Sequence, residues 1–99
     1  MSKKIAILGS TGSIGQNALR VIEQLGPEYE VFALTAHTSI DKFAAQCEKF
    51  RPRIAALTDE NAAESFSERL NGSVKSFLAG ADAMVEIVSS PEVDIVITA

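Results

Sequence analysis

Three glycines in the segment GSTGSIG, at positions 9, 12 and 15, constrain the fold of this chain more than any other feature. The segment follows directly after an apolar run, Ile5 to Leu8, and it opens a stretch with helical periodicity. Gly9 lets the chain turn sharply out of a strand, and Gly15 lets the following helix pack closely on the sheet. We therefore predict a buried strand, a tight turn and a helix over Ile5 to Leu25.

The helix after the turn is predicted to bury one apolar face, because its apolar residues recur at spacings of three and four. These residues are Ile14, Ala18, Val21, Ile22 and Leu25. Gly26 and Pro27 then end the helix, since proline cannot continue it. A second apolar strand is predicted over Val31 to Ala36, and a helix connecting two strands in this way makes them parallel.

The alternation of strands and helices continues to the end of the chain. Further strands are predicted over Ile54 to Leu57, Val74 to Leu78 and Val93 to Ile97. The expected buried faces of the intervening helices are Ile40, Phe43, Ala44, Cys47 and Phe50; then Ala62, Ala63, Phe66 and Leu70, with Asp59 as N-cap and Asn71 and Gly72 at the end; then Gly80, Ala81, Met84, Val85 and Val88. The pattern predicts the α/β class, a Rossmann-like doubly wound parallel sheet in three αβα layers.

The glycine turn also predicts binding of a dinucleotide. Gly12 has no Cβ to keep a phosphate from the backbone, and the N–H groups of Ser13, Ile14 and Gly15 are free at the start of a helix. The hydroxyls of Thr11 and Ser13 add donors, so a pyrophosphate is the expected ligand. No Gly-Lys-Ser or Gly-Lys-Thr follows the turn, which argues against a P-loop hydrolase. The alternative is a glycine turn with a structural role only.

The residues after the second strand indicate which dinucleotide binds. NAD-binding domains usually place an acidic residue there, to accept hydrogen bonds from the ribose hydroxyls. This chain instead has His37, Thr38 and Ser39, which offer donors and do not repel a 2′-phosphate. We therefore predict NADPH, with residues 1–99 as the N-terminal part of an NADP(H)-binding Rossmann-like domain. The alternative is that Thr38 and Ser39 only cap the next helix.

Ligands of a doubly wound sheet bind where the strand order reverses, outside the carboxyl ends of the strands. The second side of that site would begin after Ala99, so we expect the sheet to be incomplete after its last strand and the chain to be part of a longer protein. The net charge of −4 provides no overall positive field for nucleic acid or anionic lipid, and no apolar run approaches a membrane span.

Neither the cysteine nor the histidine predicts catalysis or metal binding in this chain. Cys47 is the only cysteine, which excludes an internal disulfide and favours a reducing, cytoplasmic location. It lies on an apolar helical face, so we expect a core residue and not a nucleophile. His37 is the only histidine and is expected at the surface near the ligand. No catalytic and no metal-binding residue is predicted.

The sequence resembles the 1-deoxy-D-xylulose 5-phosphate reductoisomerase family. The resemblance rests on ILGSTGSIG, the FALTA strand, the helix end QCEKFRP and the TDE that begins the third helix, and it covers only the N-terminal part of that family's NADPH-binding domain. By position it implies two sets of cofactor-binding residues: Thr11, Gly12, Ser13 and Ile14 for the pyrophosphate, and His37, Thr38 and Ser39 for the 2′-phosphate. Family members often have glycine, a basic residue and asparagine at the last three positions.

The resemblance implies an NADP-dependent oxidoreductase that converts 1-deoxy-D-xylulose 5-phosphate to 2-C-methyl-D-erythritol 4-phosphate in the non-mevalonate route to isoprenoids. It also implies magnesium or manganese, a phosphorylated sugar substrate and a homodimer for the full-length protein. The metal ligands and catalytic groups would follow Ala99, so we expect the 99-residue chain to be inactive alone. The alternatives are a stand-alone nucleotide-binding or interaction module, whose partner pairs with the sheet edge after Ile97, and the N-terminal part of another NADP-dependent reductase.

Overall fold

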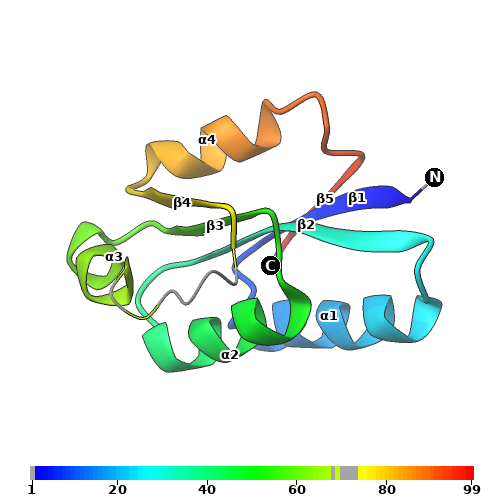
Figure 1. Ribbon diagram of the computed structural model, residues 1–99, viewed down its shortest axis with the longest axis horizontal. Helices are drawn as coiled ribbons and strands as arrows, with labels where there is room; N and C mark the ends of the chain where they lie inside the picture. Colours follow the sequence, from blue (N-terminus) through cyan, green and yellow to red (C-terminus); the bar gives the residue numbers. More distant parts are fainter. Residues whose placement is uncertain (1, 68, 70–73) are drawn as a thin grey trace.

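The computed structural model describes residues 2–67, 69 and 74–99. It contains a five-stranded sheet with helices on both faces (Figure 1). The elements are, in chain order, β1 (Lys3–Leu8), α1 (Ser13–Leu25), β2 (Tyr29–Ala36), α2 (Ile40–Phe50), β3 (Ile54–Leu57), α3 (Glu60–Ser67), β4 (Ser76–Ala79), α4 (Asp82–Val88) and β5 (Ile95–Thr98). The predicted α/β class and the Rossmann-like doubly wound architecture are confirmed.

The sheet has the order β4-β3-β2-β1-β5, and every pair of neighbouring strands is parallel. The chain winds outward from β1 to β4 through helices on one face, and α4 then carries it back across the other face to β5 (Figure 1). The strand order therefore reverses between β1 and β5. The glycine turn follows β1 and lies at this reversal.

Two hydrophobic clusters hold the three layers together. The larger cluster joins the sheet to α1, α2 and α3, and in it the rings of Phe43 and Phe66 lie with centroids 5.3 Å apart. The smaller cluster joins the other face to α4, chiefly through Phe32 and Ile87. Because successive residues of a strand point to opposite faces, Ile5 and Ile7 enter the larger cluster and Ala6 the smaller one.

The predicted buried face of α1 is partly wrong. Ile22 is buried as expected, but Ile14, Val21 and Leu25 are 62%, 54% and 53% exposed. The buried residues of α1 are Gly15, Leu19 and Ile22. Gly15 must face the backbone of the turn, and this requirement rotates the predicted apolar row by roughly a quarter of a turn into solvent.

The face of α4 is also corrected, whereas the predictions for α2 and α3 are confirmed. In α4 the sheet contacts come from Ala83 and Ile87, while Val85 is 63% exposed. Most positions of this helix are apolar, so periodicity alone does not select a face. Asp59 caps α3 as predicted, because its Oδ2 accepts a bond of 2.9 Å from the backbone N–H of Ala62. The predicted positions Leu70, Asn71 and Gly72 lie outside the described residues.

Paired substitutions in α1 test its orientation. Leu19→Ala is expected to lower the free energy of unfolding by about 2–5 kcal/mol, because it leaves a cavity beneath the helix. Val21→Ala, only two residues away, is expected to change it by less than about 0.5 kcal/mol, because this side chain is already in solvent. Urea unfolding measures the free energy of unfolding of both variants. Equal decreases in the two variants would contradict the orientation of α1 described above.

Candidate functional site

The turn after β1 is anchored to the neighbouring strand β2. Gly9 has φ +86°, a conformation that glycine adopts without the penalty of a Cβ. The backbone N–H groups of Gly9 and Ser10 both donate to the carbonyl oxygen of Thr35, at 3.0 and 2.8 Å. The register of the sheet pairs Leu8 with Thr35, so the turn begins where β2 approaches its own carboxyl end.

Gly15 and Gly12 have different structural roles in the turn. A Cβ at position 15 would lie 2.4 Å from the carbonyl oxygen of Gly9 and 2.7 Å from the Cα of Ser10, so no other residue fits there. A Cβ at position 12 would meet only the carbonyl oxygen of Gly9, at 3.7 Å. The protein therefore requires glycine at position 15, whereas at position 12 it leaves the space above the backbone open.

Two glutamines hold the turn in place. The buried hydroxyl of Ser10 donates to Oε1 of Gln46 in α2 at 2.7 Å, and Nε2 of Gln46 donates to the Ser10 carbonyl at 2.8 Å. Gln16 Nε2 donates to the Thr11 carbonyl at 2.7 Å. Neither glutamine was predicted to support the turn. Gln46 is 36 residues from Ser10 and gives no local signal, although the spacing of Gln16 from the turn gives a weak one.

The turn presents backbone donors that have no partner in the described part of the protein. The N–H groups of Ser13, Ile14 and Gly15 at the start of α1 donate to no described residue. Gly12, the N-cap residue, has no side chain to satisfy them, and the first turn of α1 contains no acidic residue. Such a helix start carries a partial positive charge and suits an anion. The predicted residues Thr11 to Ile14 are thus brought together at one end of α1.

The second predicted set follows β2 at the same edge of the sheet. Nδ1 of His37 lies 2.7 Å from Oγ1 of Thr58, the residue that follows β3. Ser39 is the N-cap residue of α2, but its side chain makes no capping hydrogen bond. The alternative in which Thr38 and Ser39 only cap the helix thus has Ser39 at the expected position, but the Ser39 hydroxyl does not make the capping hydrogen bond. His37, Thr38 and Ser39 are all exposed and their side chains are accessible to a ligand.

A cavity of about 590 Å³ opens beside the second set. Its lining combines the hydroxyls of Thr38 and Ser39 with the charged side chains of Asp41, Lys42 and Arg69. It lies at the start of α2, at the end of the sheet that carries the glycine turn.

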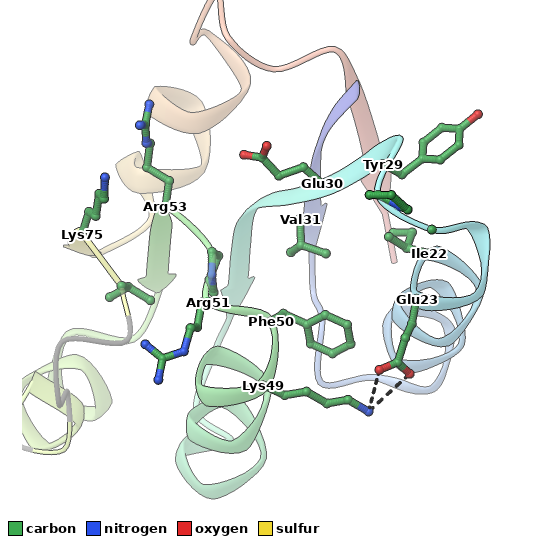
Figure 2. Close-up of a pocket in the computed structure, with 14 residues that line it drawn as sticks. Ile22, Glu23, Tyr29, Glu30, Val31, Lys49, Phe50, Arg51, Arg53 and Lys75 are labelled. Carbon is green, nitrogen blue, oxygen red and sulfur yellow. Dashed lines mark hydrogen bonds and ion pairs between the residues drawn. The ribbon is translucent and has the colours of Figure 1, made fainter. Parts of the chain in front are cut away.

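A larger cavity, of about 700 Å³, lies at the opposite edge of the sheet, where the amino ends of the strands are (Figure 2). It has an apolar floor that includes Val31 and Phe50, and its rim is charged. Two of the rim cations are paired, since Lys49 lies 3.2 Å from Glu23 and Arg53 lies 3.4 Å from Glu92. Because ligands of parallel α/β sheets bind at the carboxyl ends of the strands, we place the candidate site at the glycine turn and not here.

Cys47 is a core residue, as predicted. Its side chain is fully buried in the larger hydrophobic cluster, and burial raises the pKa of its thiol to about 12. In residues 2–67, 69 and 74–99, no three His, Cys, Asp or Glu side chains converge in a group that could hold a metal ion. Within the same residues, none of the helices has the length and apolar character that a membrane span requires.

Comparison with known proteins gives a consistent result. The family model described as 1-deoxy-D-xylulose 5-phosphate reductoisomerase matches residues 5–99. The chain is 50% identical over 99 residues to the 1-deoxy-D-xylulose 5-phosphate reductoisomerase of Actinobacillus pleuropneumoniae serotype 5b (strain L20), an alignment that covers 98% of this chain and 25% of the relative. The chain thus spans about a quarter of the length of the curated relatives it matches.

Solved structures agree in fold. A crystal structure of DOX-P reductoisomerase in complex with NADPH, fosmidomycin and magnesium matches with a TM-score of 0.86 and 32% identity, over 95% of this chain and 23% of that one. The 1-deoxy-D-xylulose 5-phosphate reductoisomerase from Zymomonas mobilis in complex with NADPH matches with a TM-score of 0.79 and 36% identity, over 87% of this chain and 23% of that one.

The buried thiol of Cys47 predicts a pH dependence of stability. The pKa of this thiol is raised from 9.0 to about 12 in the folded protein. The neutral thiol therefore contributes fully to the free energy of unfolding below pH 9, and this contribution is lost as the pH rises towards 12. Unfolding followed by circular dichroism across this range is expected to show a steeper loss for the natural protein than for Cys47→Ala. A thiol reagent is expected to label Cys47 only after denaturation, and rapid labelling of the folded protein at neutral pH would contradict its burial.

Proposed function

The chain belongs to the 1-deoxy-D-xylulose 5-phosphate reductoisomerase family, and from this membership we propose that residues 1–99 bind NADPH as the N-terminal part of its cofactor domain. The observation that carries the proposal is the glycine turn. Its unpartnered N–H groups, its open position at Gly12 and its place at the reversal of strand order all suit a pyrophosphate. The NADPH bound in two structural relatives supports it.

The residues present fit the cofactor in two parts. We propose that Thr11, Gly12, Ser13 and Ile14 hold the pyrophosphate, through backbone N–H groups and the hydroxyls of the turn. The position of Gly12 is suited to this because a phosphate can approach where a Cβ would otherwise stand. The proposal assigns His37, Thr38 and Ser39 to the 2′-phosphate. The Ser39 hydroxyl supports that assignment because it makes no capping hydrogen bond to α2 and is left to bind a ligand.

For the full-length protein we propose the family's reaction, the conversion of 1-deoxy-D-xylulose 5-phosphate to 2-C-methyl-D-erythritol 4-phosphate. Bound NADPH would supply the hydride, and the part played by this chain is to bind and orient the cofactor. The described residues of this chain do not fit the magnesium or manganese of the family, because they bring no set of acidic ligands together. We therefore assign no step through the metal to these residues. A cytoplasmic location, a homodimer and the inactivity of the 99-residue chain alone remain predictions.

Gly12→Val tests the pyrophosphate site. The backbone of Gly12, with φ −74° and ψ 170°, accepts a β-branched residue, and apart from its two chain neighbours the nearest protein atom, the Gly9 carbonyl oxygen, would be 3.7 Å from the new Cβ. We therefore expect an unchanged thermal unfolding midpoint together with a loss of NADPH affinity of about a hundredfold or more, because the side chain occupies the phosphate position. A thermal melt measures the unfolding midpoint, and isothermal titration calorimetry with NADPH and NADH measures the affinities. Natural protein that is folded but binds neither dinucleotide, or a variant that binds NADPH normally, would contradict the proposal.

A further inference from the structure

The cavity beside Thr38 and Ser39 is lined by cations that were not predicted as site residues. The three residues assigned to the 2′-phosphate offer two neutral hydroxyls and one histidine, whereas that phosphate carries up to two negative charges. Within the described residues, the cations that line this cavity are Lys42 and Arg69. The charge that the phosphate needs is thus present in the cavity, but on other residues.

Arg69 is held at the cavity by a solvent-exposed ion pair with Asp41. Its Nη1 lies 2.5 Å from Oδ1 of Asp41, in the first turn of α2. The Asp41 side chain is 92% exposed and that of Arg69 46%, and ion pairs this accessible to water contribute only about 0–1 kcal/mol. A phosphate entering the cavity therefore competes with a weakly bound carboxylate for the guanidinium.

The carboxylate of Asp41 makes Arg69 necessary for a phosphate in this cavity. Without a cation beside it, Asp41 would repel a 2′-phosphate and would instead accept hydrogen bonds from ribose hydroxyls, as in NAD-binding sites. Arg69 pairs with Asp41 in the free protein, and its guanidinium offers a planar fork of donors that matches phosphate geometry and supplies the positive charge that outweighs the carboxylate. Lys42 provides a single hydrated charge, and no ion pair with a described residue orients it.

We propose that Arg69 determines the specificity of this site for the 2′-phosphate, by exchanging Asp41 for that phosphate when NADPH binds. The proposal rests on the proposed function and identifies which side chain distinguishes NADPH from NADH. In the free protein Asp41 holds the guanidinium at the cavity. In the complex the phosphate takes its place, and Asp41 is released to solvent.

The test compares charge-removing variants of the full-length protein by calorimetry with NADPH, NADH, 2′,5′-ADP and ADP. Arg69→Gln is expected to weaken NADPH and 2′,5′-ADP about tenfold or more, because charge-assisted bonds to the phosphate are lost, and to leave NADH and ADP within about twofold. Asp41→Asn is expected to strengthen NADPH and 2′,5′-ADP, since the competing carboxylate is gone. Arg53→Gln is the matched control, because Arg53 is also 46% exposed and forms a similar ion pair at the opposite edge of the sheet.

Several results would overturn the proposal. An Arg69→Gln variant that keeps the NADPH preference of the natural protein, or a loss found only in Lys42→Gln, would show that Arg69 is not the selecting residue while the proposed function stands. Loss of NADH affinity in Asp41→Asn would show that the carboxylate binds ribose. If the natural protein binds no dinucleotide, or binds NADPH and NADH equally, the cofactor assignment fails and this proposal with it. Thermal unfolding of each variant separates lost binding from lost folding.

Discussion

The contact between Gly15 and the backbone of Gly9 and Ser10 is the constraint on which the other features of this fold depend. With no side chain at position 15, the first turn of α1 rests directly on the turn that leaves β1. This contact sets the rotation of α1, and the rotation determines that Leu19 and Ile22 enter the core. It also leaves the N–H groups at the start of the helix without an acceptor among the described residues, so one steric requirement underlies both the packing of α1 and the proposed pyrophosphate site.

The two parts of the candidate site derive from neighbouring strands. The turn after β1 is hydrogen-bonded to Thr35 of β2. His37 comes two residues after Thr35, directly after the end of β2. The parallel register of β1 and β2 thus places the glycine turn beside the residues that follow β2, which are the two sets proposed for the pyrophosphate and the 2′-phosphate. The positive character of the first comes from backbone dipoles, and that of the second from the side chains around Asp41.

Local sequence information predicted the features that local physics determines. The bounds of β3, the cap at Asp59 and the buried face of α2 each depend on residues a few positions apart, and the structure has them as expected. The rotation of α1 was mispredicted because it depends on a backbone contact outside the helix. The Ser10–Gln46 and Arg69–Asp41 pairs span 36 and 28 residues, and only the folded chain brings them together. The site was therefore predicted in its backbone elements but not in its supporting side chains.

The reciprocal bonds between Ser10 and Gln46 connect the turn to α2, the same helix that begins next to Ser39. Both ends of the candidate site are therefore attached to one rigid body, and the separation between them does not adjust as it would if a flexible loop joined them. The helix α2 thus fixes the distance between the two ends of the candidate site. For the proposed NADPH site, this fixed separation means that a ligand whose phosphate groups are spaced differently from the pyrophosphate and 2′-phosphate is expected to reach one end of the candidate site but not both.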